Sequence, residues 1–237
     1  MRWLRLDAIH IYIHVVDKRF LNAVTNGDVN IARSLLNKKS IVKFFKSKNA
    51  RVPILFAACR TGSVEMVELI LSHPDVNVNM KDMFKNNALT SLPCLNPTDN
   101  NRIINVLLEN RINVNDTNDQ GYTALHFIIV NDTIGLGYSA IEHLLKNGAN
   151  PNIPNKDGQT AIFDAAQRSL KLTKLLLDNG ADMDHTDRAG FNLIDYVRHI
   201  EEEQLDIRRE PNPRFIEILD FLTDYQEIED IKEPEDY

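Results

Sequence analysis

The stretch Gly121-Tyr-Thr-Ala-Leu-His126 decides the fold, because its pattern returns in register along the chain. It returns as Gly158-Gln-Thr-Ala-Ile-Phe163 and, more loosely, as Gly190-Phe-Asn-Leu-Ile-Asp195. Upstream, Pro53-Ile-Leu-Phe56 and Asn87-Ala-Leu-Thr90 occupy the same slot. The anchor positions 53, 87, 123, 160 and 192 follow one another at intervals of 32 to 37 residues, which indicates a repeat architecture.

A second motif keeps step with the first. Leucine-rich segments such as Ile141-Glu-His-Leu-Leu145 and Leu175-Leu-Leu177 precede Gly148-Ala-Asn-Pro-Asn152 and Gly180-Ala-Asp-Met-Asp184. A glycine directly after a helix favours the left-handed conformation that ends it. Each unit is therefore predicted to be a helix, a turn, a second helix and a projecting hairpin, and stacking of the units forms the core.

The first helix of each unit has its own start signals. Thr123 and Thr160 stand where a helix needs an N-cap, and a hydroxyl there can accept a free amide of the first turn. The turns Asn118-Asp-Gln-Gly121 and Asn155-Lys-Asp-Gly158 precede them and are typical of hairpins.

Together these motifs resemble the ankyrin repeat family over residues 17–226. The resemblance implies an all-α ankyrin-repeat solenoid of about six helix-turn-helix units with β-hairpin fingers. The expected units are 17–48, 49–81, 82–117, 118–154, 155–186 and 187–226. Residues 1–16 are expected to form an N-terminal extension or cap, and residues 227–237 an acidic C-terminal tail.

Three units depart from the pattern. The third has Pro93 and Pro97 where alanines are expected, which predicts a short first helix because interior prolines remove hydrogen bonds. The fourth carries extra residues near 131–137, and the sixth carries a charged insertion at 201–210. A helix over 215–222 is expected to follow that insertion.

Composition is that of a soluble globular protein, with 43% hydrophobic and 26% charged residues among 237. No run of 18 apolar residues exists, so no spanning helix and no membrane insertion are expected. A net charge of −7 argues against nucleic-acid binding. Two cysteines exclude a disulfide scaffold and favour a cytoplasmic protein, with the nucleus or a host cytosol as alternatives.

No catalytic constellation is present in the sequence. It has no glycine-rich phosphate loop, nucleophile elbow or His-Glu-x-x-His motif, so the chain is expected not to be an enzyme and to use no cofactor. His10 and His14 could share a helix face, but without a third ligand no metal site is expected. Cys59 stands at a position for small packed residues and is expected to be a buried, unreactive side chain. The resemblance implies that His126 bonds backbone groups between neighbouring units.

The resemblance also implies which residues bind a partner. In ankyrin-like stacks these lie on the finger tips and on the inner edge of the first helices. Carried over position by position, the candidates are Arg60, Met83, Phe84, Tyr122, Lys156, Gln159, Arg168, Arg188 and Phe191. The alternative for the aromatic side chains is that each folds onto its neighbouring finger.

The expected function is non-catalytic protein–protein interaction through the concave face of the stack. The partner is an unidentified protein, no small-molecule substrate is expected, and the chain alone is expected to be monomeric. The alternative is an inhibitor of the nuclear factor kappa-B inhibitor type, or a pathogen effector, that masks a basic surface of a host regulatory protein. It rests on the acids that begin at Asp224, and on an asparagine-rich composition typical of AT-rich genomes, such as those of large DNA viruses, intracellular bacteria and some protists.

Overall fold

The computed structural model describes residues 18–38, 41, 53–92, 97–132, 137–208 and 210–232. The predicted N-terminal extension, residues 1–16, lies outside these ranges, as do Pro93 and the last part of the predicted acidic tail, residues 233–237. The expected domain boundaries stay predictions. Across the ranges that are described, no helix is long and apolar enough to cross a membrane.

Every regular element in the described ranges is helical. The elements are α2 (Lys18–Asn26), α3 (Val29–Leu35), α5 (Ile54–Arg60), α6 (Val64–Leu71), η1 (Ala88–Ser91), α7 (Pro97–Glu109), α8 (Ala124–Asn131), α9 (Tyr138–Lys146), α10 (Ala161–Ala166), α11 (Leu170–Leu177), α12 (Leu193–Arg208) and α13 (Pro213–Lys232).

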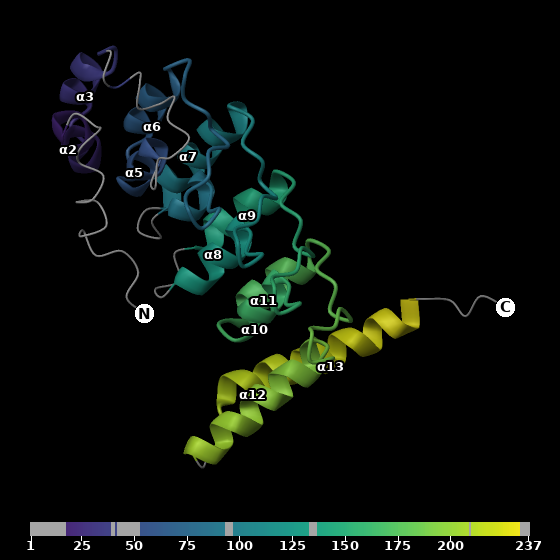
Figure 1. The fold of residues 1–237 in the computed structure, drawn as a ribbon. Coiled ribbons are helices and arrows are strands. Elements are labelled where there is room, and N and C mark those ends of the chain that lie inside the picture. Colours follow the sequence, from purple (N-terminus) through teal and green to yellow (C-terminus); the bar gives the residue numbers. More distant parts are fainter. Residues whose placement is uncertain are drawn as a thin grey trace.

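The helices stack in sequence order in two layers (Figure 1). In the first-helix layer, α2, α5, η1, α8, α10 and α12 each pack on the next. In the second layer, α3, α6, α7 and α9 follow one another, and α11 packs on α13. Each first helix also packs on the second helix of its own unit, which confirms the predicted solenoid of helix-turn-helix units.

The core is the apolar seam between these layers. Leu125 and Ile162 are almost completely buried, and burial of one such side chain contributes about 1.5–3 kcal/mol. Ala58, Cys59 and Ala165 have no exposed surface at all. These small side chains lie on the first helices, where they allow neighbouring helices to approach closely.

Asparagines join each unit to the next. Asn79, Asn115 and Asn152 occupy the same place after successive second helices. The Asn115 Nδ2 donates to the carbonyl of Gly148 at 3.0 Å, and its Oδ1 accepts the amide of Asn150 at 2.8 Å. Asn79 and Asn152 make the same pair of bonds to the following unit. Each joint thus adds two hydrogen bonds, of about 1 kcal/mol apiece.

The series ends at Asp184, which occupies the asparagine position after α11. Its side chain is exposed, and its amide donates to Asp182 Oδ1 at 2.9 Å. An aspartate cannot donate to a carbonyl. The donor bond that the asparagines make is therefore missing between Asp184 and the described part of the next unit, α12 and α13.

The fingers are tight hairpins that bond edge to edge. In the fifth unit the amide of Asn155 donates to the carbonyl of Gln159 at 2.8 Å, which closes the hairpin. The amide of Lys156 donates to the carbonyl of Gln120 on the preceding finger, also at 2.8 Å. The same bond between fingers joins Asp119 to Phe84 and Arg188 to Asp157.

Glycine is required at two kinds of position. Gly158, with φ of +80°, lies so close to the next finger that an added Cβ would stand 2.7 Å from the amide nitrogen of Arg188. Gly148 has a similar φ of +85°, but nothing lies within 4 Å of an added Cβ. Gly148 therefore serves backbone conformation alone, whereas Gly158 also serves close packing.

The third unit has the predicted short first helix. This helix, η1, is a single 3-10 turn of four residues, and Asn87 Oδ1 accepts the amide of Thr90 at its start. Pro97 does not interrupt a helix. It begins α7, where its missing N–H costs nothing, and α7 continues for thirteen residues.

The charged insertion at 201–210 is mostly helical, because its first eight residues extend α12. α13 is also longer than the helix expected over 215–222 and continues to Lys232, so the predicted acidic tail begins inside a helix. Asn212 fixes the turn between them: its amide donates to Glu201 Oε1 at 2.8 Å, and its Oδ1 accepts the amide of Arg214.

Candidate interaction surface

The predicted partner-binding residues fall into two groups by exposure. Five are exposed on finger tips or at the end of α5: Arg60, Met83, Phe84, Lys156 and Arg188. Four are only partly exposed: Tyr122, Gln159, Arg168 and Phe191. Among the described residues, Met83 is the most exposed of the larger apolar side chains, at 64%.

The aromatic rings of Tyr122 and Phe191 pack within the chain. Tyr122 makes edge contacts with the rings of His126 and Phe127, at centroid distances of 5.4 and 6.1 Å. Phe191 stacks on His199 at 5.1 Å. Contacts within the chain therefore hold both rings in place at the surface.

His126 joins two units, as the resemblance implies. Its Nδ1 accepts the amide of Thr123 at 3.2 Å, and its Nε2 lies 3.3 Å from the carbonyl of Gln159 in the next unit. These two bonds fit the tautomer that carries hydrogen on Nε2. Burial lowers the pKa of His126 to about 4, although the bond to Gln159 opposes the shift, so the ring is neutral at pH 7.

Thr160 occupies the equivalent N-cap position, but its predicted capping bond is not formed. Its hydroxyl is buried and has no hydrogen-bond partner in the described residues. In the fourth unit the hydroxyl of Thr123 lies 2.9 Å from the His126 ring, whereas the fifth unit has Phe163 at that position. A phenyl ring has no polar atom, so Phe163 cannot form a hydrogen bond with the Thr160 hydroxyl.

One position in each unit forms a row along the first-helix layer. Four residues after the anchor positions stand Ala57, Ser91, Phe127, Asp164 and Tyr196, which we call the inner row. Every member is partly exposed, while the residues before and behind them on the helices are mostly buried. The first two side chains of the row are small, and the last three are aromatic or acidic.

Asp164 stands out in this row. Its Oδ2 is buried and has no hydrogen-bond partner in the described residues. Burial raises its pKa to about 7, against the opposing charge of Arg168 one turn further on. Burial also raises the pKa of Tyr196 to about 12 and raises that of Tyr122, and the Asp164 carboxylate adds to both shifts. Asp164 thus lies electrostatically close to two tyrosines from the neighbouring units.

Sequence reasoning missed Asp164 and Tyr196. A signal was present, because an acid inside the apolar run Ala161-Ile-Phe-Asp-Ala-Ala166 is out of place in a buried helix. Tyr196 is held by its own neighbours. Its ring contacts that of Phe163 at 5.1 Å, and its hydroxyl accepts a hydrogen bond from Gln167.

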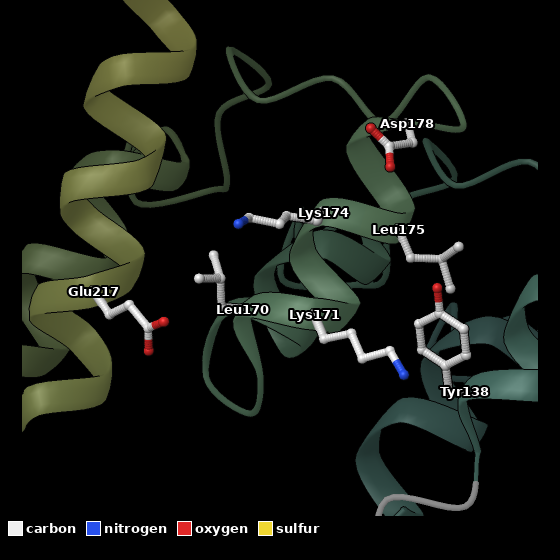
Figure 2. A pocket seen from close by; sticks show the side chains of 7 residues that line it. All are labelled: Tyr138, Leu170, Lys171, Lys174, Leu175, Asp178 and Glu217. Carbon is white, nitrogen blue, oxygen red and sulfur yellow. The ribbon is translucent and has the colours of Figure 1, made fainter.

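A shallow groove lies on the second-helix side, between α9, α11 and α13 (Figure 2). Lys171 points toward Tyr138 and holds its Nζ 4.0 Å from the ring centroid. Lys174 points toward α13, with its Nζ 4.5 Å from the Phe221 ring. Both cations already contact aromatic rings within the chain, so we interpret the groove as part of the joint among the last three units.

Reactive or metal-binding side chains do not gather in the described ranges. No group of three or more His, Cys, Asp or Glu side chains there could hold a metal ion. Cys59 is buried, and burial raises the pKa of its thiol to about 12. Such a thiol is protonated at physiological pH and is a poor nucleophile.

The stacked helix pairs and bonded fingers define a repeat solenoid. Comparison with known proteins agrees: the family model for three copies of the ankyrin repeat matches residues 94–187, and that for a single ankyrin repeat matches residues 51–83. Together these matches cover more than half of the chain. The protein belongs to the ankyrin repeat family. Ankyrin repeats are generally protein–protein interaction modules, and the family is typically non-catalytic.

Several of the similar proteins come from large DNA viruses. The ankyrin repeat protein L91 of Acanthamoeba polyphaga mimivirus is 36% identical over 133 residues, which are 55% of this chain and 20% of that protein. The mimivirus protein L86 is 31% identical over 40% of this chain and 19% of its own length. Ankyrin repeat protein OPG189 of Variola virus is 27% identical over 51% of this chain and 20% of its own length. The chain thus spans about a fifth of these relatives.

Proposed function

We propose that this chain binds a partner protein through its finger tips and the inner row. The observation that carries the proposal is Met83, which is 64% exposed at the tip of a finger beside the exposed Phe84. Apolar side chains on projecting turns are typical of interaction surfaces, where a few such anchors supply most of the binding energy. Exposed Lys156 and Arg188 on the following fingers give this surface a polar rim.

Replacing Met83 with alanine tests the proposal. Met83→Ala should weaken binding of the partner about fivefold, or ~1 kcal/mol, because it removes an exposed anchor. Ile31→Ala is the matched control, since Ile31 is 47% exposed on α3 in the second-helix layer. Partners captured by the intact chain would be identified by mass spectrometry, purified and measured by calorimetry.

The result that contradicts the proposal is an equal effect of the two variants, or no effect of Met83→Ala. Tyr122→Ala and Phe191→Ala are weaker tests. Their rings contact His126 and His199, so truncation would also disturb the fold.

A second proposal is that the chain masks a basic surface of its partner. Its support is the concentration of charge at the C-terminal end, where seven acids and one lysine follow from Asp224 onward. Part of that charge is carried by α13, which orders it along a helix. Glutamine and asparagine substitutions of the acids from 227 to 236 should lower affinity and flatten its salt dependence.

Neutralisation is a better test than deletion from Asp224. Deletion would remove Tyr225, whose ring lies 5.8 Å from that of Phe221 and belongs to the packing of α13. An affinity and a salt dependence that do not change in the neutralised chain would rule out masking and leave the finger-tip proposal in place.

We also propose that the chain is monomeric by itself and works in the cytoplasm, which would be that of a host cell if its source is a virus. Two cysteines in the whole sequence and the relatives from mimivirus and Variola virus support this placement. Cell fractionation and analytical ultracentrifugation would test it, and a secreted or stably dimeric protein would contradict it.

A further inference from the structure

The inner row contains a carboxylate that the fold leaves unused. Asp164 Oδ2 is buried without a hydrogen-bond partner, and no ion pair of Asp164 is found among the described residues. A buried polar oxygen without a partner is costly, and most native proteins avoid it. The residue as a whole is still partly exposed, so a group from outside can approach the carboxylate even though Oδ2 is covered.

Aromatic side chains flank this carboxylate on both sides. Phe127 precedes it in the inner row, and Tyr122 contacts Phe127 edge to edge at 6.1 Å. Tyr196 follows it in the row, and contacts with Phe163 and Gln167 fix its position. An acid between two aromatic side chains is a recognition site for a cation, because the carboxylate supplies charge and the rings supply polarisable faces.

Arginine fits this site better than lysine. Its guanidinium is planar, donates hydrogen bonds in a fork that matches a carboxylate, and stacks on aromatic faces. It is also more weakly hydrated than an ammonium group, so it enters a partly buried site at lower cost. We propose that Asp164 binds an arginine side chain of the partner protein between Tyr122 and Tyr196. This inference rests on the proposed function, because it names the chemistry that the inner row recognises.

The chain's own cation does not occupy the site. Arg168 lies one turn after Asp164 and lowers its pKa, but no ion pair between them occurs in the described residues. The backbone carbonyl of Arg168 is instead approached by Arg214 Nη1 at 3.5 Å. The titratable groups that act on the cluster of Asp164 and the two tyrosines come from three units: Tyr122, Asp157, Arg168, Asp187 and Tyr196.

Carboxyl-carbon NMR on the full chain tests the site directly, with N-acetyl-arginine amide as the probe. An arginine that binds only the ionised carboxylate lowers its titration midpoint. If the dissociation constant is on the order of 10 mM, ~0.1 M probe should lower the Asp164 midpoint by about one pH unit. N-acetyl-citrulline amide has nearly the same shape without the charge, and at equal ionic strength it should leave the midpoint unchanged.

The variant Asp164→Asn provides a second test of the site. The ring resonances of Tyr122 and Tyr196 should respond to the arginine probe in the intact chain and not in this variant. Equal effects of the arginine and citrulline probes would overturn the proposal. An arginine effect seen only in Arg168→Gln would overturn it too, because the chain's own arginine would then hold the site. Either failure leaves the Met83 test untouched, so the two proposals fail separately.

Discussion

Asp164→Asn should make this protein more stable above pH 7. In the unfolded chain an aspartate ionises above a pKa of about 3.8, whereas burial keeps Asp164 protonated in the fold until about pH 7. Between these values the native state binds the extra proton, so stability falls as the pH rises and levels off above 7. Asparagine has nearly the same shape and no charge, so the variant escapes this loss.

The size of the gain follows from the same shift. A change of about three pKa units corresponds to about 4 kcal/mol, which is a ceiling. Asp164 is partly exposed, and solvent screening should reduce the gain to ~2 kcal/mol. The difference between variant and parent should therefore be ~2 kcal/mol at pH 8 and close to zero at pH 4.

Urea unfolding at a series of pH values measures this difference. Asp220→Asn is the control, because Asp220 is an exposed aspartate on α13, and its substitution should change stability by less than ~0.5 kcal/mol at every pH. If Asp164→Asn destabilises the chain, or shifts its stability equally at pH 4 and pH 8, the carboxylate has a native partner and the reasoning fails.

Three further predictions concern the joints between units, all read by chemical denaturation. Asn115→Asp should cost about 2 kcal/mol, because it turns an oxygen toward the carbonyl of Gly148, whereas Asp184→Asn should change little. Gly158→Ala should cost more than Gly148→Ala, since only the former meets neighbouring backbone; equal losses would contradict this. His126 has its pKa lowered to about 4 in the fold, so stability should fall as the pH drops from 6.5 toward 4, and His126→Phe should abolish that part of the fall.

The fold followed from the sequence because its signals repeat. Gly121-Tyr-Thr-Ala-Leu-His126 indicates a turn, a helix cap and the start of a buried face within six residues. Four other units have a related motif at a similar spacing. The single-turn η1 was predictable as well, since prolines shorten a helix by a local mechanism.

The details that escaped prediction depend on neighbours. Thr160 looks like a cap, but its hydroxyl has no partner in the part of the chain that the structure describes, because Phe163 replaces the histidine of the preceding unit. The inner row escaped for the same reason. Asp164 and Tyr196 come together only when units are laid side by side, and a pattern read along one helix does not show this. The helical conformation of the charged segment 201–208 also escaped prediction, because charge alone does not distinguish a loop from an exposed helix.

The asparagine joints hold neighbouring units together in a way that does not depend on the side chains of the binding surface. Asn79, Asn115 and Asn152 bond main-chain atoms of the next unit, which every amino acid supplies. Mutations can therefore accumulate on the inner row without breaking these asparagine bonds between units. The same arrangement favours growth by duplication: a copied unit would arrive with its own asparagine and find a compatible backbone on either side. Inserting a further unit directly after α11 would need one change at Asp184, from a residue that cannot donate to one that can.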